Sequence, residues 1–154
     1  MVKYLLGDLL ASDCDYICHQ VNCQGAMNSG IAKQIREKWP VVYTEYKAYC
    51  NYCKKHGLEM MGHIFDVDVD DSDKRVINMF AQSNYGYDNK LYTSYDAFYK
   101  CLTEIRRTVR GGTIGFPHGI GCGLGGGNWK VISAMIEETL GDDYDVYIYK
   151  YYGD

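Results

Sequence analysis

The segment FPHGIGCGLGGGNW (Phe116–Trp129) decides how the chain folds, because six of the nine residues from Gly119 to Gly127 are glycine. Glycine loses more conformational entropy on folding than any other residue, so a run of this density requires a structural reason. The strand-like run TIGFP precedes it, and a helix-like amphipathic stretch follows it. We interpret the segment as a loop whose backbone approaches another group closely, with no Cβ between them.

A second glycine-containing loop, NCQGAMNSG (residues 22–30), occupies the equivalent place after another strand-like run, DYICHQV. The residues that follow it place Ile31, Ile35 and Trp39 at helical spacing. Free N–H groups at a helix N-terminus form an anion site, and glycine lets the backbone come close to the anion. Two such loops predict two adjacent phosphates held between them. The alternative is that the glycines only permit tight turns.

Strand-like and helix-like segments alternate along most of the chain. Helical spacing is clear in residues 41–55, in the stripe from Tyr95 to Val109, and from Ile132 to Leu140. This alternation predicts a three-layer α/β domain with a mixed, partly parallel sheet. A chain of 154 residues fits one domain, so we expect a single domain over residues 1–154. In such sheets, ligands bind beyond the carboxyl ends of the strands.

Composition excludes several classes of protein. The net charge of −4, without a dense Lys/Arg run, argues against duplex nucleic-acid binding. Asp8 and Asp13 interrupt the first residues, which predicts neither a signal peptide nor a membrane span. Seven cysteines predict free thiols in a reducing, cytoplasmic compartment, and scattered charge leaves a monomer as the expectation. The CNYC pair, Cys50 and Cys53, lies on an apolar helix stripe, so we expect core thiols and no metal site or cofactor.

Two known phosphate motifs match the glycine loop weakly. Gly121, Gly123 and Gly126 fit G-x-G-x-x-G, but too little chain follows to build the usual dinucleotide-binding half. The spacing of a P-loop also occurs, but Gly127 and Asn128 stand where Lys and Ser/Thr are required. An NTPase is therefore not expected.

Four segments, GDLL, HQVNCQGAMNSGIAKQI, NMFAQSNYG and FPHGIGCGLGGGNWKVISAMIEE, occur in the order seen in macrodomains, the ADP-ribose-binding modules. The chain most resembles the subgroup that contains the terminal ADP-ribose protein glycohydrolase and the ADP-ribose-1″-phosphate phosphatases. The resemblance spans nearly the whole chain. It implies a six-stranded mixed sheet between helices, with ADP-ribose or an ADP-ribosylated substrate across the strand ends and its pyrophosphate between the glycine loops.

The same resemblance implies roles for individual residues. It places Asp8 at the adenine amine and Leu9 beside the ring, although Asp8 could instead cap a turn. Asn22 falls at the distal ribose, where its amide can donate and accept hydrogen bonds. The remaining expected ligand-binding residues are Gly30, Ile31 and Ala32 in the first loop, Gln82, Pro117, and Gly121, Cys122, Gly123, Leu124 and Gly125 in the second.

The chain departs from the lysine-and-aspartate pair of the related glycohydrolase. Gln82 stands at the position of the lysine and Gly125 at that of the aspartate, so the lysine mechanism is excluded. The candidates for catalysis are His19, Asn22, Asn28 and His118, with Asp88 ranked after them. His19 is alternatively a core histidine satisfied by hydrogen bonds. Hydrolysis of protein-linked or nucleobase-linked ADP-ribose or of ADP-ribose-1″-phosphate, and non-catalytic reading of ADP-ribose, both remain open.

Overall fold

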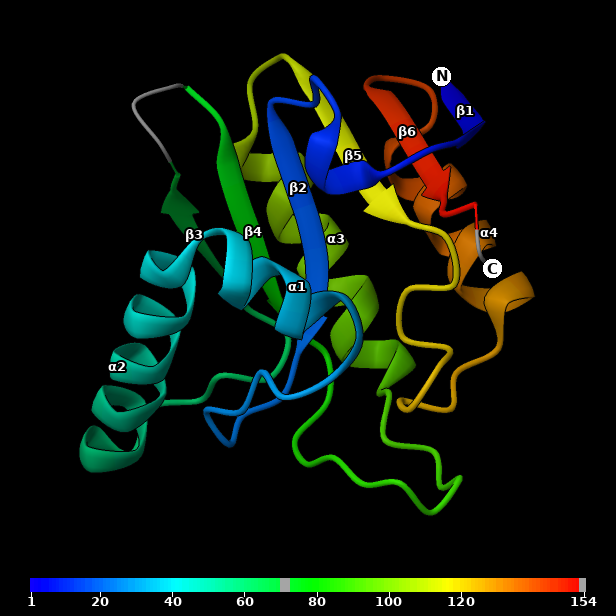
Figure 1. Cartoon of the computed structure of the whole chain (residues 1–154). Coiled ribbons are helices and arrows are strands. Elements are labelled where there is room, and N and C mark those ends of the chain that lie inside the picture. The colour runs from blue at the N-terminus through cyan, green and yellow to red at the C-terminus, as the bar shows by residue number, and fades with distance from the viewer. Residues whose placement is uncertain (70–72, 153–154) are drawn as a thin grey trace.

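A computed structural model describes residues 1–69 and 73–152 of the chain. Its centre is a six-stranded sheet in the order β1-β6-β5-β2-β4-β3 (Figure 1). Neighbouring strands are parallel except for β3 and β4, which are antiparallel. The mixed, partly parallel sheet is therefore confirmed. The strands are β1 (Val2–Leu6), β2 (Tyr16–Val21), β3 (Ile64–Asp68), β4 (Arg75–Phe80), β5 (Thr113–Pro117) and β6 (Asp145–Lys150).

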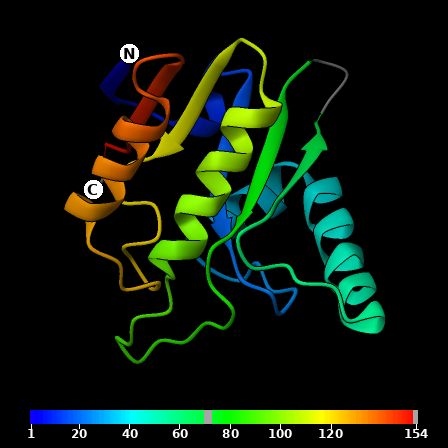
Figure 2. The same cartoon turned by 180° about the vertical axis from the view of Figure 1, so that it is seen from behind.

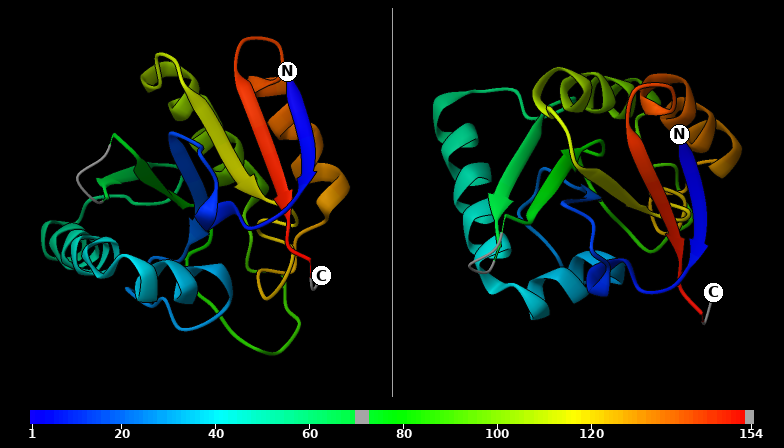
Figure 3. Two further views of the ribbon diagram at one scale, coloured as in Figure 1. Left: turned by 45° about the horizontal axis from the view of Figure 1, so that its top comes forward. Right: turned by 90° about the horizontal axis from the view of Figure 1, so that it is seen from above.

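Helices form a layer on each side of this sheet. The helices α1 and α2 cover one face and α3 and α4 the other (Figures 1, 2 and 3). Their bounds are α1 (Gly30–Lys38), α2 (Pro40–His56), α3 (Tyr95–Thr108) and α4 (Trp129–Leu140), with a short 3-10 turn, η1 (Leu9–Ala11), after β1. This confirms the three-layer α/β fold. Among the described residues, no helix has the length and apolarity needed to span a membrane.

The position of the strand β2 inside the sheet explains why its sequence is largely apolar. Ile17 and Val21 point into the core beneath α1 and α2, whereas Cys18 points into the core beneath α3 and α4. Successive strand residues face opposite sides, so a strand covered by helices on both faces needs apolar side chains throughout. Side chains of β2 therefore pack in the cores beneath both helical layers.

Parallel pairing brings the carboxyl ends of five strands to one edge of the sheet. The segments that follow β2, β4 and β5 gather there, below the sheet in Figure 1. The strands β1 and β6 end at the same edge, because β1, β5 and β6 run parallel. The segments that follow them therefore begin there. Both glycine-containing loops therefore lie where a ligand is expected in an open α/β sheet.

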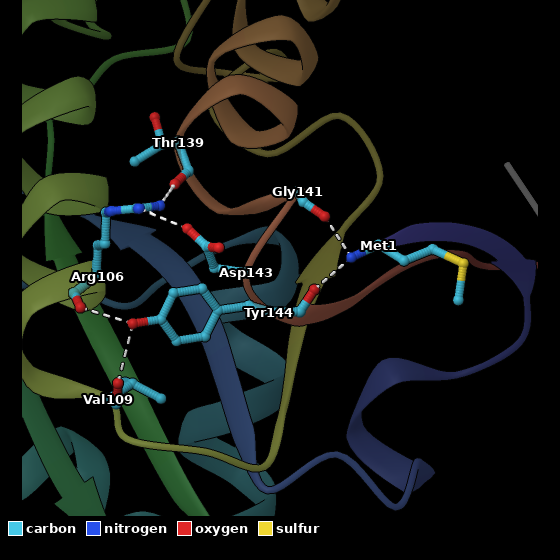
Figure 4. Close-up of polar contacts among 7 residues, drawn as sticks. All are labelled: Met1, Arg106, Val109, Thr139, Gly141, Asp143 and Tyr144. Carbon is cyan, nitrogen blue, oxygen red and sulfur yellow. Dashed lines mark hydrogen bonds and ion pairs between the residues drawn. The ribbon is translucent and has the colours of Figure 1, made fainter.

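A polar clasp ties α3 to the turn between α4 and β6 (Figure 4). The Tyr144 hydroxyl lies 2.6 Å from the Arg106 carbonyl oxygen and 3.1 Å from that of Val109, at the C-terminal end of α3. Arg106 in turn donates to the Thr139 carbonyl oxygen and pairs with Asp143. Helix C-terminal carbonyls lack partners within the helix, so a tyrosine hydroxyl satisfies them.

We expect Tyr144→Phe to lower the free energy of unfolding by about 1 kcal/mol, because it removes the donor from two carbonyls and keeps the ring. Denaturant unfolding measures this change. Tyr99→Phe, on the exposed side of the same helical layer, is the matched control and should leave the stability unchanged. An equal free energy of unfolding for Tyr144→Phe and the native chain would show that the Tyr144 hydrogen bonds do not stabilise the fold.

Candidate ligand-binding cavity

One cavity of about 460 Å³ opens at the carboxyl edge of the sheet. The segments after β1, β2, β4, β5 and β6 all contribute to its wall. Most of the residues expected to bind the ligand or to catalyse its hydrolysis line the cavity: Asp8, Leu9, Asn22, Asn28, Gly30, Ile31, Ala32, Gln82, Pro117, His118, Gly121, Gly123, Leu124 and Gly125. The topology thus joins residues that are more than 100 positions apart in sequence.

The first loop delivers the N-terminus of α1 to this cavity. Gly30 begins the helix with φ +57°, a left-handed conformation that favours glycine. The side chain of the N-cap residue Ser29 makes no capping hydrogen bond. The N–H groups of Gly30, Ile31 and Ala32 have no partner among the described residues, and all three residues line the cavity. This end of α1 is therefore free to receive an anion.

The second loop presents further N–H groups across the cavity. Hydrogen bonds within the loop use the N–H groups of Ile120, Cys122, Gly126 and Gly127. Those of its cavity-lining residues Gly121, Gly123, Leu124 and Gly125 have no partner in the described parts of the chain. Gly121 has φ +75°, as expected for a loop that folds back on itself. Successive free N–H groups in such a loop form a concave anion site.

The N-terminus of α4 does not take part, contrary to the expectation that the second loop would use it. Asn128 caps this helix with its own side chain, which accepts from the Lys130 N–H at 2.9 Å. The residues at this helix start do not line the cavity. The free N–H groups on this side of the cavity therefore belong to the glycine loop and not to the start of α4.

Thr93 fastens the second loop to the segment that follows β4. Its hydroxyl donates to the Gly121 carbonyl oxygen at 2.7 Å, and its N–H donates to the Gly125 carbonyl oxygen at 3.0 Å. An ideal Cβ on Gly125 would lie 2.6 Å from Thr93 Oγ1 and 2.7 Å from the Gly121 carbonyl oxygen. Glycine at 125 is therefore required by the close approach of Thr93.

Gln82 is held in the same network. Its Nε2 donates to the Asn84 carbonyl oxygen at 2.8 Å, so its Oε1 is the acceptor for Gln20 Nε2, 2.7 Å away. Gln20 Nε2 also donates to Thr93 Oγ1 at 2.8 Å. Gln82 thus provides a neutral amide that links β2 to the segment after β4.

Asp8 lines the cavity and also caps a turn. Its Oδ1 accepts from the Leu10 N–H at 3.0 Å at the start of η1. Its other carboxylate oxygen has no partner among the described residues, and the residue is exposed in the cavity wall. Both readings of Asp8 from the sequence are compatible with this geometry.

His19 does not reach the cavity. Its side chain is fully buried on the same face of β2 as Ile17 and Val21, and its Nε2 lies 2.6 Å from Asn78 Oδ1. Because Asn78 Nδ2 donates to the Phe65 carbonyl oxygen, its Oδ1 accepts from the ring. Burial lowers the pKa of His19 from its ordinary value of 6.5 to about 4. This placement corrects the expectation of a direct catalytic role, because a ligand in the cavity cannot touch the ring.

Cys122 is the second predicted residue outside the cavity wall. Its side chain packs against the core beneath α3 and α4, and its Sγ lies 3.4 Å from the Ile120 carbonyl oxygen. Burial raises the pKa of this thiol. The turn that brings Gly121 and Gly123 to the cavity directs Cys122 inward, which the sequence could not show.

His118 and Asn28 remain at the cavity. The His118 ring packs against the Trp129 ring at an interplanar angle of 44°, with ring centroids 4.6 Å apart. Asn28 is exposed, and its Oδ1 accepts from Arg36 at 3.3 Å. Asp88 does not line the cavity but accepts from the Tyr92 hydroxyl at 2.7 Å, which lowers its pKa.

Residues 18–136 match the family model described as Macro domain. The chain belongs to the Macro domain family. It is 30% identical to the DNA ADP-ribosyl glycohydrolase of Mycobacterium tuberculosis, over 97% of this chain and 42% of that protein. It is 28% identical to the ADP-ribose 1″-phosphate phosphatase of Meyerozyma guilliermondii, over 63% of this chain and 55% of that protein. The chain thus spans less than half the length of the mycobacterial relative it matches.

A solved structure supports the same assignment. The macrodomain of Mycobacterium tuberculosis DarG superposes with a TM-score of 0.82 at 28% identity, covering 97% of each chain. The expected macrodomain resemblance is therefore confirmed over nearly the whole length.

Sequence reasoning missed the aromatic rim of this macrodomain. Tyr85 and Tyr87, after β4, and Tyr149 and Tyr151, at the end of β6, line the cavity. Tyr87 is 67% exposed. The chain contains 16 tyrosines, and neither their number nor their spacing distinguishes those at the rim from those in the core.

The cysteine pair is part of the macrodomain core. Cys50 and Cys53 are buried in the C-terminal half of α2, and their burial is what their helical spacing predicts. Within residues 1–69 and 73–152, no group of three or more His, Cys, Asp or Glu side chains is arranged to hold a metal ion.

The lowered pKa of His19 makes the stability of the macrodomain depend on pH. Between pH 6.5 and 4 the unfolded chain binds a proton at this ring and the folded chain does not, so stability falls as the pH falls. We expect a loss of about 3 kcal/mol from this ring across that interval. His19→Gln keeps an N–H donor and cannot titrate, so its unfolding free energy should depend less steeply on pH. If the unfolding free energies of His19→Gln and the native chain change equally with pH, the expectation is wrong.

We expect Gly125→Ala to destabilise the macrodomain by about 1–3 kcal/mol, because the new methyl group would collide with Thr93 and the Gly121 carbonyl. Gly123→Ala is the matched control in the same loop, since an added Cβ meets nothing within 4 Å there. Thermal or denaturant unfolding of the two variants tests the difference. Equal stability would mean that the loop is not fastened by Thr93.

Proposed function

We propose that this macrodomain binds ADP-ribose and hydrolyses an ADP-ribose derivative, without the lysine nucleophile of the related glycohydrolase. The observation that carries the proposal is the pair of free N–H sets, from α1 and from the glycine loop, at one cavity. None of the described residues that line the cavity is Lys or Arg. A diphosphate held there would be bound by backbone dipoles.

The two ends of the cavity differ chemically, as an ADP-ribose ligand requires. The free carboxylate oxygen of Asp8 is an acceptor suited to the adenine amine. Asn22 and Asn28 lie with the first loop, where the distal ribose is expected. One relative is named a DNA ADP-ribosyl glycohydrolase and another an ADP-ribose 1″-phosphate phosphatase. Both names support a substrate that is modified at the distal ribose.

Among the residues expected to catalyse hydrolysis, His118 is the one that both lines the cavity and carries an imidazole, the side chain used most often as a general acid or base. We propose that it acts as the general acid or base and that Asn22 and Asn28 orient the ribose and water. We further propose a cytoplasmic monomer that needs no metal or other cofactor and does not bind duplex nucleic acid.

A second candidate function is a non-catalytic reader of ADP-ribose. The locked amide of Gln82 and the absence of a side chain at Gly125 favour it, because neither can supply the chemistry of the related lysine–aspartate pair. A reader would use the same cavity. It would leave the modified substrate intact.

Calorimetric titration with ADP-ribose, compared with AMP, tests the binding proposal. We expect stoichiometric binding of ADP-ribose and much weaker binding of AMP, which lacks the diphosphate and the distal ribose. No binding at about 1 mM ligand, equivalent to roughly −4 kcal/mol, would overturn the ADP-ribose assignment.

Turnover is tested with ADP-ribose-1″-phosphate, an ADP-ribosylated protein and an ADP-ribosylated single-stranded DNA oligonucleotide. We expect release of ADP-ribose from one of them, and a loss of about 100-fold in kcat for His118→Gln with affinity retained. Tight binding with no release from any substrate over hours would identify a reader. An unchanged kcat in His118→Gln would remove this residue from the mechanism.

A further inference from the structure

The buried hydroxyl of Tyr46 contacts Asn22 twice. Tyr46 lies on α2 with no exposed surface, and its hydroxyl is 2.7 Å from the Asn22 carbonyl oxygen and 2.9 Å from Asn22 Oδ1. Its one hydrogen is therefore shared between two oxygens of the same residue. Asn22 is the first residue after β2, at the point where the chain turns into the first loop.

Further hydrogen bonds fix the orientation of the Asn22 amide. The N–H groups of Gln24 and Ala26 donate to Asn22 Oδ1 at 2.9 and 3.4 Å. Since a backbone N–H can only donate, the atom that they contact must be the amide oxygen. Asn22 Nδ2 donates to the Ala26 carbonyl oxygen at 2.9 Å, which agrees with this assignment.

These contacts leave the Asn22 side chain with a free hydrogen-bond donor but no free acceptor. Its Oδ1 already faces three donors, from Gln24, Ala26 and Tyr46, and one of its two Nδ2 hydrogens is used. Asn22 lines the cavity and is 8% exposed. The second Nδ2 hydrogen is what remains for a ligand, so this side chain presents a donor and no free acceptor.

Tyr46 is held in place by its ring. Phe80 stacks on it with ring centroids 5.9 Å apart, and Tyr43 packs beside it at 6.5 Å. Burial raises the pKa of Tyr46, so the hydroxyl stays protonated and remains a donor at any physiological pH. The hydroxyl cannot follow a movement of the loop without disturbing the core beneath α2.

We propose that Tyr46 is a positioning residue that, through Asn22, makes the ribose end of the cavity selective for a hydrogen-bond acceptor. The inference rests on the proposed function, because it takes the distal ribose of ADP-ribose as the group that Asn22 contacts. Tyr46 itself touches no ligand. Its role is to hold the amide so that an N–H, and not the carbonyl, faces the ribose oxygens.

The test compares ADP-ribose with ADP, which has the same adenosine diphosphate but no distal ribose. Tyr46→Phe should weaken ADP-ribose binding by about 3- to 10-fold, the effect of loosening one hydrogen-bonded contact, and leave ADP binding unchanged. A purely structural defect would weaken both ligands alike. Tyr49→Phe, one turn further along α2 and stacked on Phe65, is the matched control and should change neither affinity.

Two further measurements separate positioning from packing. In an Asn22→Asp background, which replaces the free donor by an oxygen, Tyr46→Phe should cause no additional loss of ADP-ribose affinity. Hydrogen exchange at the amides of Gln24 and Ala26 should be faster in Tyr46→Phe than in Tyr49→Phe, and this readout needs no ligand.

Equal losses for ADP and ADP-ribose in Tyr46→Phe, or no loss at all, would overturn the positioning role alone. So would unchanged exchange at Gln24 and Ala26. If the native chain binds neither ligand, the proposed function fails and this inference fails with it.

Discussion

The contact between Thr93 and the carbonyl oxygens of Gly121 and Gly125 is the interaction on which the ligand cavity depends. It joins the segment after β4 to the loop after β5, and Gln20 extends the connection to β2. The glycine loop has few side chains with which to hold its own shape. Backbone hydrogen bonds within the loop are therefore supplemented from outside, by the hydroxyl and the N–H of the buried Thr93 and by the N–H of Tyr92.

This arrangement separates the two functions of the loop's peptide groups. The carbonyl oxygens of Gly121 and Gly125 are used for anchoring, whereas the N–H groups of the same residues remain without partners among the described residues. An anion site of this kind does not depend on the protonation of a side chain. It also suits an acidic chain, because no lysine or arginine has to be concentrated at the cavity.

The two departures from the related glycohydrolase are structurally linked. A side chain at position 125 would occupy the space taken by Thr93, and Gln82 is bonded to Gln20, which is bonded to the same threonine. A lysine at 82 could not accept from Gln20 as the glutamine does. The network thus joins β2 to the segments after β4 and β5 by neutral hydrogen bonds.

Hydrophobic spacing and glycine placement in the sequence determined the layers, the strand–helix alternation and the two loops, because these follow from local periodicity and from the absence of a Cβ. The family's pattern located Asp8, Asn22 and the glycine-loop residues at one cavity. Only the tertiary structure decided that His19 faces the core and Cys122 turns inward, since both depend on where a strand ends and how a loop bends. The contact that holds the Asn22 amide from α2 was likewise decided by the tertiary structure, since Tyr46 lies 24 residues away and reaches Asn22 only when α2 packs on the sheet.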